Sequence, residues 1–242
     1  MGETTFRQGV CAYCGNIGEV TDDHIVPRCL WPGRVRKDVP IVDACRPCNH
    51  IWKSEYDTYL RDILVNDMAC AKNHIAQKVR EKYYRAAKNN RSIMARDLNE
   101  RAGLVGLQED SGLVSGFALT LPDAVKRNQV IMPLIVRGLH LYYLRTALPK
   151  DTSFKVGRVI EREKMQELIR EMNENGGGYQ NIGTGDVFQF AFWPRPGDPY
   201  PQVWVLNFYR CIRFVVAIRA SILWETNSSL IYYNTLISKS GI

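Results

Sequence analysis

The chain has 242 residues, of which 45% are hydrophobic and 24% charged, as is typical of a soluble globular protein with one large domain or two small ones. It contains no run of 18 or more apolar residues and no signal-peptide core near its start, so a cytoplasmic protein without a membrane-spanning helix is expected. The net charge of +7 favours a polyanionic partner.

The first half of the chain predicts short strands and then helices. Strands are expected over 19–26 and over VPIVDA (39–44). After Asn49 a helix is predicted from an apolar stripe at helical spacing, formed by Tyr56, Tyr59, Leu60, Ile63 and Leu64. A second helical stretch runs from Ala69 to about Ala87. It overlaps a basic segment, residues 72–96, with eight basic residues and one acid. The basic side chains of this segment are expected to face either phosphates or solvent.

The second half predicts a mixture of helix and antiparallel sheet. A strand over 111–121 should stop at Pro122, with a long helix from Asp123 to Ala147 after it. A strand over 153–160, a helix over 161–173 and a glycine-rich loop over 173–186 come next. Strands are then expected in VFQFAFW, QVWVLNFY and IRFVVAIRA. Their aromatic residues favour a core over a base-stacking platform, and these are Trp193, Trp204, Phe208, Tyr209 and Phe214.

Four of the seven cysteines form two C-x-x-C pairs, Cys11/Cys14 and Cys45/Cys48, separated by 30 residues. Zinc prefers four thiolates in a tetrahedron, and each pair supplies two corners. A disulfide framework is not expected in a cytosolic chain, and neither pair has the strand-to-helix setting of a thioredoxin-like redox site. The spacing therefore predicts a closed, structural zinc site that brings residues 20–26 close to residues 45–57.

Within this frame lie the four side chains that hydrolysis of a phosphodiester would need: Asp23, His24, Asn49 and Lys53. A carboxylate and an amide oxygen suit Mg²⁺ or Mn²⁺, a neutral imidazole suits a general base, and a lysine suits a phosphate. Residues four apart share a helix face, so Asn49 and Lys53 should point the same way.

The segments CAYC, DDHIVPR and CRPCNHIWKS together resemble the HNH endonuclease family, in the branch whose ββα-metal site is framed by a four-cysteine zinc. The similarity covers about residues 11–57. It implies an α+β protein with an N-terminal ββα-metal module, and we expect a division into 1–66 (nuclease module), 67–110 (basic helical connector) and 111–242 (α+β accessory domain with an antiparallel sheet).

The resemblance also implies roles for individual residues. Asp23 and Asn49 would bind the catalytic Mg²⁺ or Mn²⁺, His24 would be the general base, and Lys53 would lie near the phosphate. Cys11, Cys14, Cys45 and Cys48 would bind the structural Zn²⁺. The family's usual asparagine before the third cysteine is Pro40 here, so Asp38, Asp43 or a backbone carbonyl would have to hold His24.

Other polar residues near the motif carry weaker expectations. Asp22 is expected to cap a turn, His50 and His74 to lie at the surface, and His140 to lie in the core. Basic residues around the motif are candidates for contact with phosphates, and these are Arg28, Arg34, Arg36, Lys37 and Arg46.

The predicted function is metal-dependent cleavage of nucleic acid, with double-stranded DNA as the default substrate. Two alternatives stay open. One is a non-catalytic zinc module that binds nucleic acid or protein, which Pro40 favours. The other is an enzyme held inactive until a ligand or regulatory partner acts on residues 110–242. A homodimer is also compatible with the resemblance, since many such nucleases need two sites to cut both strands.

Overall fold

The computed structural model describes most of the chain in several segments, residues 7–34, 39–87, 103–108, 114–120, 124–159, 178–182, 185–194 and 201–218, and a few single residues between 163 and 174.

A small antiparallel sheet forms the N-terminal part. Its strand order is β1-β2-β3, with bounds β1 Arg7–Val10, β2 Ile17–His24 and β3 Ile41–Cys45. In the register of the sheet Asp23 lies opposite Val42, and His24 lies opposite Ile41. Because successive side chains of a strand point to opposite faces, Thr21 and Asp23 share one face of β2 and Asp22 and His24 share the other.

A helical segment follows this sheet directly. It begins as a π-helical stretch, η2 (Pro47–Lys53), and continues as α1 (Ser54–Asn66). A short turn, η3 (Met68–Cys70), leads to α2 (His74–Ala87). Another short turn, η1 (Arg28–Leu30), lies between β2 and β3. The helices α1 and α2 are neighbours, and Leu64, Val79 and Tyr83 are buried, so the predicted helical stripes bury the expected faces.

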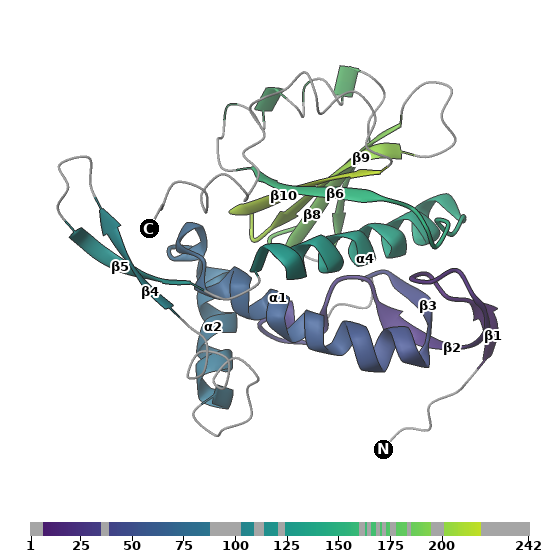
Figure 1. The fold of residues 1–242 in the computed structure, drawn as a ribbon, viewed down its shortest axis with the longest axis horizontal. Helices are drawn as coiled ribbons and strands as arrows, with labels where there is room; N and C mark the ends of the chain where they lie inside the picture. The colour runs from purple at the N-terminus through teal and green to yellow at the C-terminus, as the bar shows by residue number, and fades with distance from the viewer. Residues whose placement is uncertain are drawn as a thin grey trace, which may run out of the picture.

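The second half begins with a hairpin of β4 (Gly103–Gln108) and β5 (Val114–Thr120), which stands away from the rest of the molecule (Figure 1). The long helix α4 (Ala124–Leu144) follows. A five-stranded antiparallel sheet of order β6-β10-β9-β8-β7 completes the fold. Its strands are β6 Phe154–Val159, β7 Gly178–Ile182, β8 Phe188–Pro194, β9 Pro201–Phe208 and β10 Ile212–Ile218.

Helix α4 lies between the five-stranded sheet and the layer formed by α1 and the N-terminal sheet (Figure 1). A helix covered on two sides must be apolar around most of its circumference. Accordingly Ile131, Met132, Ile135, Val136 and Leu139 are all buried. One hydrophobic core extends through both layers, from Cys11 in the N-terminal part to Ile218 in the last strand.

Most of the predicted elements are confirmed, and the exceptions are short strands. The strands expected around 19–26, 39–44, 111–121 and 153–160 are present, as are the three aromatic strands. The loop predicted over 173–186 is wrong in part, because β7 forms there and pairs with β8. Strands β1 and β4 were not expected; each is short, and each is defined by pairing with a neighbour. Most of the helix predicted over 161–173 lies outside the described residues.

The expected burial of the aromatic residues is confirmed. Trp204, Phe208, Tyr209 and Phe214 are buried, and Trp193 is partly buried. The division of the chain at residues 66 and 110 stays a prediction: α1 ends at Asn66, and the second boundary falls between the paired strands β4 and β5. No helix among the described residues is long and apolar enough to cross a bilayer.

Candidate metal and catalytic centre

The four paired cysteines come together at one point. The sulfur atoms of Cys11, Cys14, Cys45 and Cys48 all lie within 4.8 Å of one another. The Sγ atoms of Cys14 and Cys45 are 3.8 Å apart. A tetrahedron with Zn–S bonds of about 2.3 Å has edges of about 3.8 Å, so this spacing suits zinc. In the part of the chain that the structure describes, no other group of three or more His, Cys, Asp and Glu side chains could hold a metal ion.

Local backbone contacts build this cluster. The first cysteine pair closes a turn in which the Gly15 amide donates to the Cys11 carbonyl at 2.8 Å, and Gly15 has a φ of +74° that favours glycine. The Ala12 amide donates to the Asp43 carbonyl at 2.8 Å, which ties the turn to β3. A hydrogen bond with Cys48 lowers the pKa of Cys11, and the same hydrogen bond raises the pKa of Cys48.

Helix α4 supplies a positive charge next to the cluster. The guanidinium of Arg137 donates to the carbonyls of Leu148 and Pro149 at 3.0 and 2.9 Å. Burial lowers the pKa of Arg137, and the nearby Cys14 and Cys48 act in the opposite direction. A zinc ion with four thiolates carries a net charge of −2, so a cation at this position would stabilise it.

Asp23 points from β2 toward the helix and is bonded on both sides. Its exposed fraction is 8%. The Tyr13 hydroxyl donates to Asp23 Oδ2, and the Lys53 ammonium lies 3.2 Å from the same oxygen. Lys53 is 2% exposed, and its ammonium also donates to the His24 carbonyl at 2.8 Å and to Asp57 Oδ2 at 3.1 Å. Lys53 therefore ties the Asp23–His24 segment to the start of α1.

The electrostatics of this cluster are set by two carboxylates that share one ammonium. Burial raises the pKa of Asp57 to about 6, and the charge of Asp23 adds to this effect while Lys53 opposes it. Burial alone would lower the pKa of Lys53, but the charges of Asp57 and Asp23 outweigh it and the net shift is upward. Lys53 is therefore a cation at neutral pH, and the cluster has a surplus of negative charge.

Asn49 reaches the same face of β2 as Asp23. Its amide nitrogen donates to Thr21 Oγ1 at 3.3 Å, and it lies 3.5 Å from the Asp22 carbonyl. Both Asn49 and Lys53 thus face β2, as their spacing predicted. The amide nitrogen is turned to the strand, and no donor to Asn49 Oδ1 is found among the described residues.

His24 is half-buried and lies on the opposite face of β2 from Asp23. Burial lowers its pKa, with a further contribution from the charge of Arg28, so the imidazole is neutral at pH 7. No hydrogen bond to the His24 ring is found among the described residues. Asp43 is bonded by Arg7, and Asp38 lies outside the described residues. The Pro40 carbonyl accepts a hydrogen bond from the Ile25 amide at 3.2 Å, so the partner found for this carbonyl is a backbone amide and not the His24 ring.

The remaining predicted residues fall into three groups. The expectation that Asp22 caps a turn is wrong, because it lies within β2, where it is exposed and pairs with Arg7 at 2.7 Å. Arg28, Arg34 and Arg46 are exposed. His50 and His74 are exposed and His140 is fully buried, as expected. Arg36 and Lys37 lie outside the described residues.

Two residues of the site were missed or undervalued in the sequence. Tyr13 sits inside the first C-x-x-C pair, which puts it beside whatever that pair approaches, and it bonds Asp23. Asp57 is four residues after Lys53, the spacing at which helical side chains pair. Both residues can be assigned to the site from the sequence, once the two cysteine turns are assumed to lie together.

No protein-family model matches the chain, and no curated protein or solved structure matches it either. The residues of the site comprise a four-cysteine cluster that could bind zinc, and beside it a strand and a helical segment that bring together Asp23, Asn49 and Lys53.

Proposed function

We propose that the protein is a metal-dependent endonuclease that hydrolyses phosphodiester bonds in nucleic acid, with DNA as the substrate. The observation that carries the proposal is the meeting of Asn49 and Lys53 with the strand that bears Asp23 and His24, beside four clustered cysteines. This is the arrangement that the resemblance to the HNH family implies. The cysteines would bind a structural Zn²⁺.

The donor set next to the zinc cluster suits a hard divalent cation. A carboxylate oxygen of Asp23 and Oδ1 of Asn49 would hold Mg²⁺ or Mn²⁺, and the surplus of negative charge in the cluster favours a cation there. When bound, the ion would stabilise the negative charge that develops on the phosphate.

His24 would act as the general base. Its lowered pKa keeps the imidazole neutral, so it can accept a proton from water. The resulting hydroxide attacks phosphorus, the bond from phosphorus to the leaving oxygen breaks, and that oxygen takes a proton from solvent. The neighbouring Arg28 is exposed and bears a positive charge suited to the phosphate.

Lys53 would be a positioning residue. It holds the Asp23 carboxylate at 3.2 Å and the His24 carbonyl at 2.8 Å, so it fixes both residues of the motif from one atom. Direct contact between Lys53 and substrate phosphate remains a prediction, because the ammonium is buried in this structure.

Plasmid cleavage with a matched pair of histidine variants tests the proposal. Wild-type protein should nick plasmid DNA with Mg²⁺ or Mn²⁺, and His24→Ala should lose at least about 100-fold in rate, the usual contribution of a general base. His74→Ala changes an exposed histidine outside the site and should cut at the wild-type rate. Zinc content and circular dichroism should match in all three proteins. A His24→Ala protein that cuts as fast as the wild type would refute the assignment.

One observation favours a second function, a non-catalytic zinc module that binds nucleic acid. Asp23 is 8% exposed and is already bonded by Tyr13 and Lys53, and the His24 ring lacks a described hydrogen-bond partner. Wild-type protein that shifts DNA in a gel but does not nick it with Mg²⁺, Mn²⁺, Co²⁺ or Ni²⁺ would support this second function.

A further inference from the structure

An open hollow of about 730 Å³ lies between the turn that follows β2 and the helix α2. Among the described residues its lining comprises Arg28, Cys29, Gly33, Arg34 and Lys82, of which three are cations and none is acidic. They come from segments about fifty residues apart, so the fold, and not one basic stretch of sequence, brings the charges together.

In the part of the chain that the structure describes, the three cations of the hollow lack the acidic partner that several other basic residues have. Arg7, Lys53, Arg61 and Arg158 each form an ion pair with an aspartate. Arg28, Arg34 and Lys82 are exposed, and among the described residues none of them forms an ion pair or a side-chain hydrogen bond. Like charges that gather in a hollow without countercharge repel one another, so an anion bound there would stabilise the site.

The walls of the hollow are fixed in place before any ligand binds. On one side the Cys29 thiol donates to the Asp57 carbonyl, and the Tyr209 hydroxyl donates to the Leu30 carbonyl at 2.8 Å. These contacts tie the turn to α1 and to the C-terminal sheet. A site built on such supports loses little entropy when it binds a ligand.

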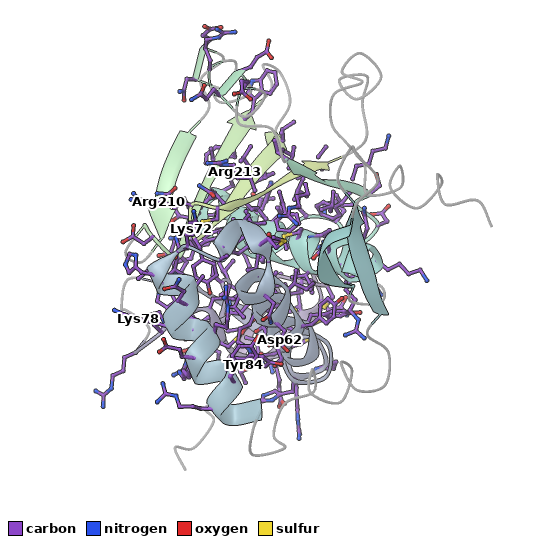
Figure 2. The ribbon with its side chains drawn as sticks, turned by 90° about the vertical axis from the view of Figure 1, so that its left-hand side faces the viewer. Asp62, Lys72, Lys78, Tyr84, Arg210 and Arg213 are labelled. Carbon is purple, nitrogen blue, oxygen red and sulfur yellow. The ribbon has the colours of Figure 1, made fainter. Side chains whose placement is uncertain are left out.

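The other wall is α2, which is bound firmly to α1. Arg80 Nε donates to the Val65 carbonyl at 2.6 Å, and the Tyr84 hydroxyl donates to Asn66 at 2.9 Å. Figure 2 shows Asp62 and Tyr84 near the meeting of these helices, and Lys78 on the outer side of α2. Lys78 is exposed and lies one turn before Lys82, so it extends the positive surface along the helix.

The hollow adjoins the proposed catalytic residue. Arg28 lines the hollow and lies four residues after His24, in the turn η1 that follows the end of β2 at His24. A strand of nucleic acid with one phosphate at His24 would therefore have further phosphates near Arg28 and beyond.

We propose that this hollow binds a backbone phosphate of the nucleic acid next to the phosphate that is cleaved, and so directs the strand from His24 across α2. This inference rests on the proposed nuclease function and adds a substrate path to it. Arg34 and Lys82 contact the phosphate from opposite walls, and Arg28 lies between them and the catalytic centre. Lys78 follows along the same path.

Two charge-matched double variants test this path by DNA binding. The full-length, zinc-loaded protein is titrated into a fluorescently labelled DNA duplex, without added Mg²⁺ or Mn²⁺, at several salt concentrations. Arg34→Gln/Lys82→Gln removes two charges from the hollow. Lys150→Gln/Lys155→Gln removes two exposed charges elsewhere. Thermal melting of each protein checks that the fold is retained.

The hollow variant should bind DNA more weakly, and because it loses the contacts to one phosphate, the slope of log affinity against log salt should fall by about one. Its loss of affinity at about 50 mM salt should therefore exceed its loss at about 200 mM by roughly threefold. The control should keep the wild-type slope. Equal slopes for the two double variants would overturn the proposed path.

The same proteins separate failure of this inference from failure of the nuclease function. If the wild-type protein cuts plasmid and the two double variants bind DNA with equal affinity, the phosphate path alone is overturned. Wild-type protein that binds DNA but never cuts it overturns the nuclease function, while the binding comparison still decides the hollow. Wild-type protein that neither binds nor cuts DNA overturns both.

Discussion

Lys53 is the residue on which most of the candidate site depends. Its ammonium lies between the carboxylates of Asp23 and Asp57, and it is almost completely buried. Replacing it with an uncharged side chain would leave two carboxylates close together without countercharge. Such an uncompensated buried charge is far more harmful than loss of an exposed ion pair.

We therefore predict that Lys53→Met lowers the free energy of unfolding by about 3–5 kcal/mol, measured by urea denaturation of the zinc-loaded protein. Lys150→Met, at an exposed lysine, should change it by less than about 0.5 kcal/mol. Equal stability of the two variants would show that Asp23 and Asp57 do not depend on Lys53.

Asp57 should make stability depend on pH. Its pKa of about 6 in the folded protein is higher than the ordinary value of 3.8, so the folded state binds a proton more readily than the unfolded state between these values. The stabilisation by protonated Asp57 is therefore lost as pH rises through 6.

We predict that the wild type loses about 1 kcal/mol relative to Asp57→Asn between pH 5 and pH 7, as measured by urea denaturation of both proteins. The variant provides the control, because all other titrating groups are shared and cancel in the difference. A difference that stays constant, or that grows in favour of the wild type as pH rises, would contradict the raised pKa of Asp57.

At the scale of elements, the contact of α4 with the residue that follows β2 determines how the candidate site is supported. Gly138 of α4 lies against Ile25, the residue directly after His24. A Cβ atom added at Gly138 would lie 3.0 Å from both Cγ1 and Cγ2 of Ile25, which is fully buried. The glycine thus allows α4 to approach the motif closely, at some loss of helix propensity.

Gly138→Val should destabilise the protein by about 1–3 kcal/mol because it overpacks this contact. Ile25→Ala in the same chain should recover part of the loss, and a double-mutant cycle in urea denaturation measures the coupling between the two positions. Additive effects of the two substitutions would mean that the contact does not limit the approach of the helix.

The elements with strong local patterns could be predicted from the sequence. The helix α1 follows from its apolar stripe, and strands β8, β9 and β10 follow from dense aromatic and β-branched residues. The spacing of the four cysteines predicted their cluster, since two C-x-x-C turns offer one simple way to complete a tetrahedron. The shared direction of Asn49 and Lys53 followed from helical spacing.

Features that depend on distant partners were not predictable in this way. Strands β1, β4 and β7 have weak patterns of their own and are defined by the neighbours they pair with. The burial of Lys53 depends on Asp23, thirty residues earlier. The hollow beside His24 needs Lys82 to lie opposite Arg34, which the packing of α2 on α1 decides.

At the scale of the whole molecule, one core joins the cysteine cluster to the C-terminal sheet through α4. Metal binding that stabilises the cysteine turns should therefore stabilise the distant strands as well, because binding free energy adds to folding free energy.

We predict that Cys48→Ser lowers the zinc content below one ion per chain and weakens hydrogen-exchange protection of amides in β9 and β10. Cys29→Ser, at a cysteine outside the cluster, should keep one zinc ion and wild-type protection. Unchanged protection in β9 and β10 after loss of zinc would show that the two layers unfold independently.

The central claim, a catalytic metal site on Asp23 and Asn49, is tested most directly by anomalous diffraction from crystals soaked in Mn²⁺. We expect a manganese peak within about 2.5 Å of a carboxylate oxygen of Asp23 and of Oδ1 of Asn49, separate from the zinc peak among the four cysteines. A zinc peak with no manganese between Asp23 and Asn49 would contradict it, and would favour a zinc module that binds nucleic acid without cutting it.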